Sequence, residues 1–395
     1  MIKKSTIQKM FFSLLFNLNT LGLPFGVMWT NVLSPLMLIH ILLRRQFTYV
    51  IISFLCILGY VLLQYNSMQI PKFQDYLLAT IYFFTSILVS IFFYIYFNDN
   101  KTKHDDILIS IIKGNIVLTF IAVILYIVPF FKDIFWHVSK NINSFGEVRL
   151  QLFFYEPSHL SFVFSFFISY LLLNVLFFPE KKYLKFLIFT LVSIYLTKSL
   201  GTMATMATSI IIGFMIFFIP LIRIFYKKVA LITIISIIVI PLVSESLISR
   251  IDKFTEGKDN SGNVRLIYAT SSAYDMIEKY NYLFGVGFGQ TKVYVKEFTS
   301  KIHGYGTDNL PNSFASTLAT VGIVGISLKF FFLFFLFFKK RIYSNIFKLI
   351  SFFYLLLYGF VGGWMLNVYE FIFLAIIFSN SFSEFDKNNI FKRFK

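Results

Sequence analysis

Cysteine and charge are both scarce in this sequence, and each scarcity excludes a class of protein. The chain has 395 residues and a single cysteine, Cys56, so a fold held together by disulfides is excluded. Only 14% of the residues are charged, whereas soluble domains carry about 25%. Hydrophobic residues make up 57% and the mean hydropathy is +0.74, which is too apolar for a water-soluble core of this length. The composition therefore predicts a polytopic membrane protein.

The motifs of several enzyme classes are also missing. The sequence has no Walker loop, no dinucleotide-binding context, no Ser-His-Asp arrangement and no histidine pair with metal-ligand spacing. The net charge of +17 could suggest a nucleic-acid partner, but the basic residues lie in short clusters between apolar runs. Such clusters are typical of membrane topology signals, so we expect no nucleic acid. The first apolar segment lacks a small-residue cleavage site, so we expect no cleaved signal peptide.

The apolar runs predict spanning helices, because a helix needs about 20 apolar residues to cross a bilayer. Lipid offers no hydrogen-bond partner to the main chain, so each segment is expected to be helical. About twelve candidates follow one another: 7–22, 24–43, 47–65, 76–97, 107–131, 156–178, 183–199, 200–220, 229–246, 312–338, 346–363 and 364–382. The predicted fold class is an all-α polytopic membrane protein, with residues 1–395 as a single integral membrane domain.

Basic clusters set the expected orientation, since lysine and arginine favour the cytoplasmic side. One cluster precedes the first segment, one follows each of the second, fourth, sixth, eighth and tenth segments, and one ends the chain. In chain order the clusters are Lys3, Lys4 and Lys9; Arg44 and Arg45; Lys101 and Lys103; Lys181, Lys182 and Lys185; Arg223, Lys227 and Lys228; Lys339, Lys340 and Arg341; Lys387, Lys392, Arg393 and Lys395. In a twelve-helix count all of them fall on one side, so both termini are expected in the cytoplasm. The outer side then holds two loops, 132–155 and the much longer 247–311, and loops of such length are usually functional or disordered.

An arginine, a glutamate and a histidine lie close together in RLQLFFYEPSHL (149–160). Pro157 fits the first position of a helix, which places Glu156 at the N-cap and His159 in the first turn. Glu156 could simply cap the helix, and His159 could be an ordinary interfacial residue. With Arg149 nearby at the outer interface, the three ionisable groups favour a functional site instead.

Two further groups of candidates follow in the second outer loop. An amphipathic helix is predicted to start near Asn263, with Arg265 in its first turn. A cation is unfavourable at this end of the helix dipole, so Arg265 is expected to need an anion as partner. The alternative is a solvated loop arginine. Gly285, Gly287 and Gly289 form a weak phosphate motif, and a tight turn back to the membrane is the preferred interpretation. His303 and Asp308 lie in the loop before the tenth segment, which Asn312 and Ser313 open.

Glycines and a lone lysine complete the pattern. Gly322 and Gly325 inside the tenth segment are expected to permit close packing between helices. Lys198, in the outward turn TKSLGT (197–202), is a cation on the side where few are expected. Its side chain could also snorkel to the membrane interface.

These pieces, in this order, resemble the bacterial O-antigen polymerase and ligase superfamily of membrane glycosyltransferases, the Wzy and WaaL type. The resemblance rests on EPS opening a helix after an outward arginine, on TKSLGT, on Arg265 heading NYLFGVGFG, and on PNSFASTLATVGIVG. It covers most of residues 140–335 and implies a C-type glycosyltransferase-like fold with one large extracytoplasmic loop. It also implies localisation in the bacterial cytoplasmic membrane.

The resemblance implies a reaction as well. Family members move a glycan from undecaprenyl pyrophosphate to an acceptor hydroxyl at the outer membrane face, with inversion and without metal or other cofactor. Arginine forks suit the leaving pyrophosphate, so Arg149, Arg265 and Lys198 are the expected phosphate-binding residues. The expected catalytic residues, which would accept the proton of the acceptor hydroxyl, are Glu156, His159 and His303. Acceptor glycan, membrane lipid, a flippase and a chain-length regulator are the implied partners.

Two departures from the family pattern bear on the choice of function. Family ligases carry a histidine eleven residues before the closing GxxG, where this chain has Pro311, and the turn motif often has arginine where this chain has Leu200. The missing histidine leads us to expect a polymerase for O-antigen, capsule or exopolysaccharide, and the EPSH segment is likewise more typical of polymerase-like members of the family. The alternatives are a ligase, a lipid-linked oligosaccharide flippase or other carrier, and a non-catalytic scaffold. A carrier is expected to place its charges near the midplane in repeated halves, which this sequence does not do.

Overall fold

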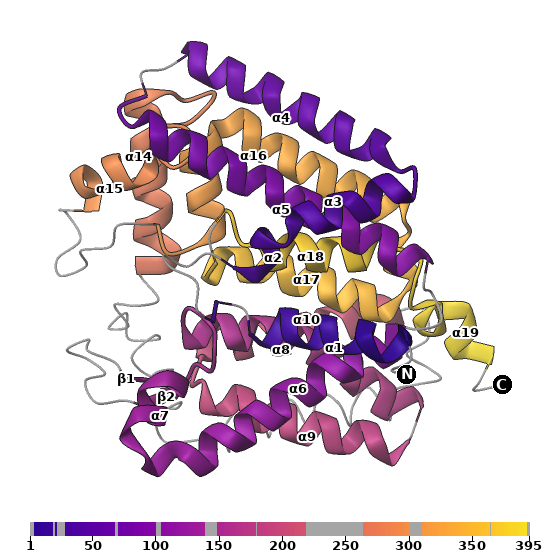
Figure 1. Cartoon of the computed structure of the whole chain (residues 1–395). Coiled ribbons are helices and arrows are strands. Elements are labelled where there is room, and N and C mark those ends of the chain that lie inside the picture. Colours follow the sequence, from indigo (N-terminus) through magenta and orange to yellow (C-terminus); the bar gives the residue numbers. More distant parts are fainter. Residues whose placement is uncertain are drawn as a thin grey trace.

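The computed structural model describes residues 4–18, 20–21, 28–67, 70–99, 104–138, 148–178, 180–218, 264–299, 310–363 and 365–392 (Figure 1). Six of the described helices are long and apolar enough to cross a membrane: Phe47–Ser67, Phe73–Asp99, His104–Ile127, Pro157–Phe177, Leu200–Phe218 and Ser313–Lys339. Shorter apolar helices accompany them: Ser34–Leu43, Ile346–Val361 and Val368–Phe378. The expected all-α polytopic membrane fold is confirmed.

The described elements follow the predicted segments closely. In chain order they are α1 (Lys4–Asn17), α2 (Trp29–Val32), α3 (Ser34–Leu43), α4 (Phe47–Ser67), α5 (Phe73–Asp99), α6 (His104–Ile124), η1 (Leu125–Ile127), α7 (Pro129–Phe135), β1 (Trp136–Val138), β2 (Val148–Leu150), α8 (Pro157–Phe177), α9 (Lys181–Leu196), α10 (Leu200–Phe218), η4 (Val264–Tyr268), α14 (Ala269–Tyr280), α15 (Thr291–Thr299), α16 (Ser313–Lys339), η5 (Ile342–Ser344), α17 (Ile346–Val361), α18 (Val368–Phe378), η6 (Ser383–Phe385) and α19 (Lys387–Lys392). Each predicted segment within the described residues coincides with one to three of these helices. Segment 229–246 lies outside them, so the count of twelve stays a prediction.

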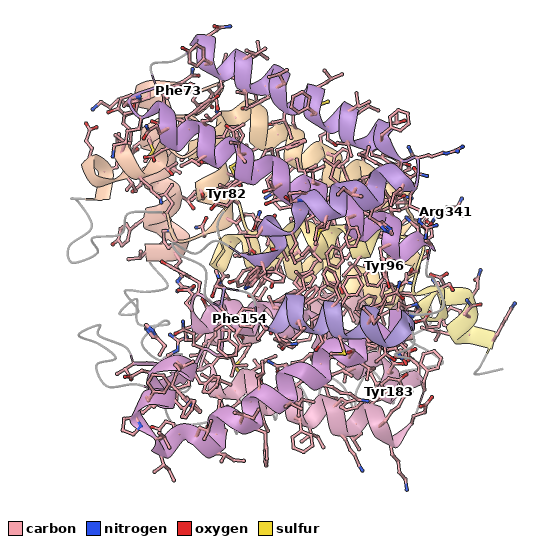
Figure 2. The ribbon with its side chains drawn as sticks, in the orientation of Figure 1. Phe73, Tyr82, Tyr96, Phe154, Tyr183 and Arg341 are labelled. Carbon is pink, nitrogen blue, oxygen red and sulfur yellow. The ribbon has the colours of Figure 1, made fainter. Side chains whose placement is uncertain are left out.

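The bundle has two distinct ends. Figure 1 places both termini and α19 at one end, and the β1–β2 hairpin, α14 and α15 at the opposite end. Figure 2 places Arg341 and Tyr183 toward the end that holds the termini. Ion pairs join the basic clusters to acidic residues of neighbouring helices at that end: Lys9 with Asp106 at 2.8 Å, Arg44 with Asp99 at 3.4 Å and Lys182 with Asp105 at 3.8 Å. The described basic clusters and the described parts of the predicted outer loops thus lie at opposite ends, as expected, while the side of the membrane that each end faces stays a prediction.

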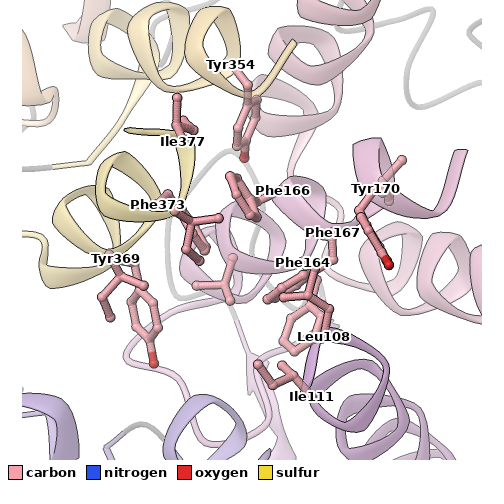
Figure 3. Packing of buried hydrophobic residues seen from close by; sticks show 14 of the residues in the cluster. Leu108, Ile111, Phe164, Phe166, Phe167, Tyr170, Tyr354, Tyr369, Phe373 and Ile377 are labelled. Carbon is pink, nitrogen blue, oxygen red and sulfur yellow. The ribbon is translucent and has the colours of Figure 1, made fainter. Parts of the chain in front are cut away.

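Aromatic packing around α8 forms the centre of the bundle (Figure 3). In α8, 83% of the apolar stretch is buried, because α9, α10 and α17 pack around it. The Phe166 ring stacks on the Phe373 ring of α18 with centroids 4.0 Å apart. The Tyr354 hydroxyl donates to the Phe162 carbonyl at 3.0 Å. Because lipid is as apolar as these side chains, close packing of this kind holds such helices together.

A break interrupts α16 at Gly322, which has φ 62 and ψ −169. The outer segment 281–287 docks on the break: the Val286 and Gly287 N–H groups donate to the Ala319 and Thr320 carbonyls at 2.8 and 3.1 Å. In return, the Ile323 and Val324 N–H groups donate to the Tyr282 and Leu283 carbonyls, both at 3.1 Å. The main-chain groups freed by the break are thereby satisfied, as a membrane environment requires.

The prediction that Gly322 serves helix–helix packing was therefore wrong. A Cβ at Gly322 would lie 2.4 Å from the Leu283 carbonyl oxygen, so the close approach is to a loop and not to another helix. The physical reason is the left-handed φ, which a side chain rarely adopts. The turn interpretation of the loop glycines is confirmed, since Gly285, Gly287 and Gly289 all have positive φ.

Candidate functional site

Arg149 connects the β hairpin to the turn between α9 and α10. The strands β1 and β2 pair antiparallel, with His137 opposite Arg149. The neighbouring Leu150 is fully buried, and strand alternation turns Arg149 to the other face. Its Nε donates to the Thr197 carbonyl at 2.8 Å. Arg149 and the TKSLGT turn, which are far apart in sequence, therefore form one corner of the end opposite the termini.

Lys198 occupies the same turn in a left-handed conformation, with φ 50. Its N–H donates to the Tyr195 carbonyl at 2.9 Å, and its side chain is exposed. A left-handed lysine costs about 1–2 kcal/mol, and strain of this kind gathers at functional sites. The geometry places Lys198 next to the contact of Arg149 with Thr197, while its role in binding stays a prediction.

Glu156 and His159 lie at the start of α8, where the sequence places them. Glu156 is the N-cap residue, with φ −151 and ψ 161, and Pro157 occupies the first helical position. The Ser158 hydroxyl donates to the Glu156 carboxylate. His159 Nε2 lies 4.0 Å from Glu156 Oε1; the histidine side chain is 4% exposed and the glutamate side chain 46%. The start of α8 therefore presents a carboxylate beside a buried imidazole.

Electrostatics set the charge state of Glu156. Burial raises the pKa of its carboxyl, but His159, the Ser158 hydroxyl, Arg265 and Arg149 all lower it. The pKa of Glu156 therefore lies below its ordinary value. The carboxylate is ionised at neutral pH, and both arginines lie close enough to attract it.

Arg265 lies in the π-helical turn η4 that leads into α14. Its Nη1 donates to the Val361 carbonyl, at the end of α17, at 3.3 Å. Its own carbonyl accepts a hydrogen bond from the Asn312 side chain. Single π turns occur often at functional sites, where they redirect a side chain. The amphipathic helix expected from Asn263 onward is confirmed as η4 followed by α14, with Ala269, Ala273, Met276 and Ile277 buried.

The structure thus brings five of the six candidates to one end of the bundle. Arg149 and Arg265 both act on Glu156, and His159 lies beside it. Lys198 adjoins this group through Thr197. His303 lies outside the described residues, so its position relative to the group stays a prediction.

Sequence reasoning missed two charged residues that form an ion pair within the apolar helices α16 and α18. Lys329 of α16 and Glu370 of α18 form an ion pair, with Nζ 2.8 Å from Oε1. Both stand alone in apolar runs, SLKFFFLFF and VYEFIFLAIIF. A lone charge in a spanning segment is by default a functional hypothesis, and that signal was available in the sequence. Tyr358 of α17, which is polar but uncharged, is buried within electrostatic range of Glu156, Arg265 and Glu370.

The fold and the site together define a multi-pass membrane protein with a cationic and acidic cluster at one end of its helix bundle. The O-antigen ligase family model matches residues 185–330, from α9 to the middle of α16. The resemblance to the O-antigen polymerase and ligase superfamily is thereby confirmed. No curated protein and no solved structure matches the chain. The match supports a bacterial membrane enzyme of glycosyltransferase type that uses lipid-linked glycans; Lys198 and Arg265 lie within it, and Arg149, Glu156 and His159 precede it.

Proposed function

We propose that the protein is a polysaccharide repeat-unit polymerase. It transfers a glycan from undecaprenyl pyrophosphate to a hydroxyl of an acceptor sugar at the outer face of the cytoplasmic membrane. The observation that carries this proposal is that Arg149 and Arg265, from distant segments, both lie within electrostatic range of Glu156. Two guanidinium groups suit the phosphate oxygens of a pyrophosphate leaving group. The product is an O-antigen, a capsule or another exopolysaccharide.

In this reaction the acceptor oxygen attacks the anomeric carbon while the bond from that carbon to the pyrophosphate oxygen breaks. The anomeric centre inverts, the bonding electrons leave with the pyrophosphate, and its negative charge grows. Arg149 and Arg265, with Lys198, stabilise that charge without a metal. The proton of the attacking hydroxyl goes to Glu156, His159 or His303.

Among the proton acceptors, Glu156 has the best-defined geometry. Its lowered pKa keeps it deprotonated, which a proton acceptor requires. The same shift makes it a weak base, since the best catalytic pKa lies near the operating pH. Glu156 therefore contributes at the low end of general-base catalysis, partly by holding the acceptor hydroxyl with a hydrogen bond.

A ligase that joins finished glycan to its final carrier is the second candidate. The description of the matching family as an O-antigen ligase favours it. Pro311, at the position of the ligase histidine, favours the polymerase. Both candidates use the same donor and the same arginines, so they differ in the acceptor.

A glycan profile of a deletion strain tests the proposal. We expect single lipid-linked repeat units in the deletion strain, polymer after complementation with the wild type, and no polymer with Arg265→Ala. Arg44→Ala is the matched control, because Arg44 pairs with Asp99 at the opposite end of the bundle. Long glycan still attached to undecaprenyl pyrophosphate would support the ligase, and a normal profile in the Arg265→Ala strain would contradict both candidates.

A further inference from the structure

One carboxylate spans the break in α16. Glu370, in the first turn of α18, accepts a hydrogen bond from Ser313 Oγ on Oε2 at 3.1 Å. Its Oε1 accepts from Lys329 Nζ at 2.8 Å. Ser313 lies before the break at Gly322, and Lys329 lies after it. Both halves of α16 are therefore held by the same side chain.

A straight α16 could not make these two contacts. Ser313 and Lys329 are sixteen positions apart, and an unbroken helix would separate them by about 24 Å. The lysine stem covers only a small part of that length. The contacts of Glu370 thus depend on the bend at Gly322, and they fix how far the first half of α16 folds back.

The first half of α16 in turn holds Arg265. Asn312, its N-cap residue, donates its side-chain amide to the Arg265 carbonyl. The Ser313 N–H donates to the Gly362 carbonyl at 3.0 Å, next to the Val361 carbonyl that receives Arg265 Nη1. The end of α17 thus fixes both the arginine and the start of α16. A shift of this start moves the main chain of Arg265.

The surroundings of the ion pair argue against a ligand site. The cavity beside it, lined in part by Ser313, Thr317, Lys329 and Glu370, has a volume of about 40 Å³. Pockets for small-molecule ligands measure about 300–1,000 Å³. A sugar or a lipid headgroup does not fit, so the pair serves the protein itself. Stability alone is a weak reason for burying charges here, because apolar side chains of similar volume often serve equally well.

We propose that Glu370 is a positioning residue for glycan transfer, which holds Arg265 against the leaving group by bridging the two halves of α16 through Ser313 and Lys329. The inference rests on the proposed function and assigns a role to the ion pair inside the membrane. Glu370 does not touch the substrate. Lys329 attaches the carboxylate to the second half of the helix.

A double-mutant cycle with Arg265 tests this role. Turnover is measured with purified protein, lipid-linked donor and acceptor glycan, for Glu370→Ala alone and in an Arg265→Lys background. We expect Glu370→Ala to lower turnover about tenfold or more in the wild type, and about twofold or less when Arg265 is already altered. The KM for the acceptor is expected to stay constant. Thr317→Ala is the matched control, since Thr317 lines the same cavity but donates only to the Ser313 carbonyl of its own helix.

Two results would overturn the inference. Equal losses in both backgrounds would mean that Glu370 acts independently of Arg265, and an unchanged turnover would mean that the bridge is not needed. Full activity of Arg265→Ala would instead refute the proposed function, which keeps the two failures distinguishable. If Glu370→Ala does not fold, Glu370→Gln replaces it, because the amide retains an acceptor for Ser313 and loses the charge that pairs with Lys329.

Discussion

The two ends of the bundle use their charges differently. At the end with the termini, charged side chains meet other side chains: His104 Nε2 lies 2.7 Å from Glu384 Oε1, and the Tyr170 hydroxyl donates to Asp105 at 2.6 Å. At the opposite end Lys279 pairs with Glu297, but the two arginines of the candidate site donate to main-chain carbonyls, Arg149 to Thr197 and Arg265 to Val361. A carbonyl orients a guanidinium and adds no full charge of its own. The ion pairs at the first end join helices together, and in the proposed function the arginines at the second end stabilise the leaving pyrophosphate.

The largest expected effect comes from removing one of those oriented charges. Arg265→Ala should lower transfer activity by about 10²–10³-fold, the usual loss when a donor that stabilises the leaving group is removed. The thermal stability of the purified protein should change little, since Arg265 contacts a carbonyl at the surface of the bundle. Activity assays with the Arg44→Ala control check the contrast. Equal losses of transfer activity in Arg265→Ala and Arg44→Ala would show that charges at the two ends of the bundle do not differ in function.

Glu156→Gln is expected to cost somewhat less. We expect a loss of about 10²-fold, at the low end of general-base contributions, because the lowered pKa makes Glu156 a weak base. Initial rates at saturating donor measure it. A loss that appears only in KM would assign Glu156 to acceptor binding instead of proton transfer.

The pH–rate profile sharpens the same point. The pKa of Glu156 is lowered, so its carboxylate stays ionised until the pH falls below about 4.3, the ordinary value for glutamate. Wild-type activity should therefore show no acid limb from Glu156 between pH 7 and about pH 5. Arg149→Gln removes one of the charges that lower this pKa, so the acid limb should move to higher pH. An unchanged limb would show that Arg149 does not act on Glu156 in the enzyme.

A change at the other end should affect stability and spare activity. Tyr170→Phe removes the hydrogen bond to Asp105 and should lower the free energy of unfolding by about 1.5 kcal/mol. Turnover per folded molecule should stay the same. Thermal unfolding followed by an activity assay measures both quantities. A loss of turnover without a loss of stability would contradict the structural role of this end.

Lys198→Ala should have the smallest effect of the series. Its side chain is exposed, so we expect a loss of about threefold to tenfold, as for one partly solvated charge near the phosphates. If Lys198 only snorkels to the membrane interface, Lys198→Arg and Lys198→Ala should both keep full activity. Donor KM measurements separate the two interpretations.

The spanning helices could be predicted from the sequence because each needs only its own apolar length. The start of α8 could also be predicted from neighbouring residues alone, since Pro157 after Glu156 indicates a helix start without any tertiary contact. The β1–β2 hairpin was missed because strands of three residues are too short to show alternation. Its pairing depends on a contact between distant residues of the first outer loop.

The break in α16 shows a second limit. GIVG reads as a helix-packing motif, and only the docking of segment 281–287 reveals that Gly322 interrupts the helix. The bridge from Glu370 to Ser313 and Lys329 depends on that break, so it could not be derived either. Glu370 and Lys329 could still have been noticed as isolated charges in apolar runs.

The exchange of hydrogen bonds at Gly322 also constrains how the protein is made. The main-chain groups at the break find partners in segment 281–287, and each group left unsatisfied in lipid costs several kcal/mol. That segment precedes α16 in the chain, so it leaves the ribosome first. The second half of α16 is therefore expected to settle in the bilayer at low cost only once segment 281–287 has docked on the break. In the orientation predicted from the basic clusters, this favours an order of assembly in which the glycine loop reaches its place before the helix bundle is complete.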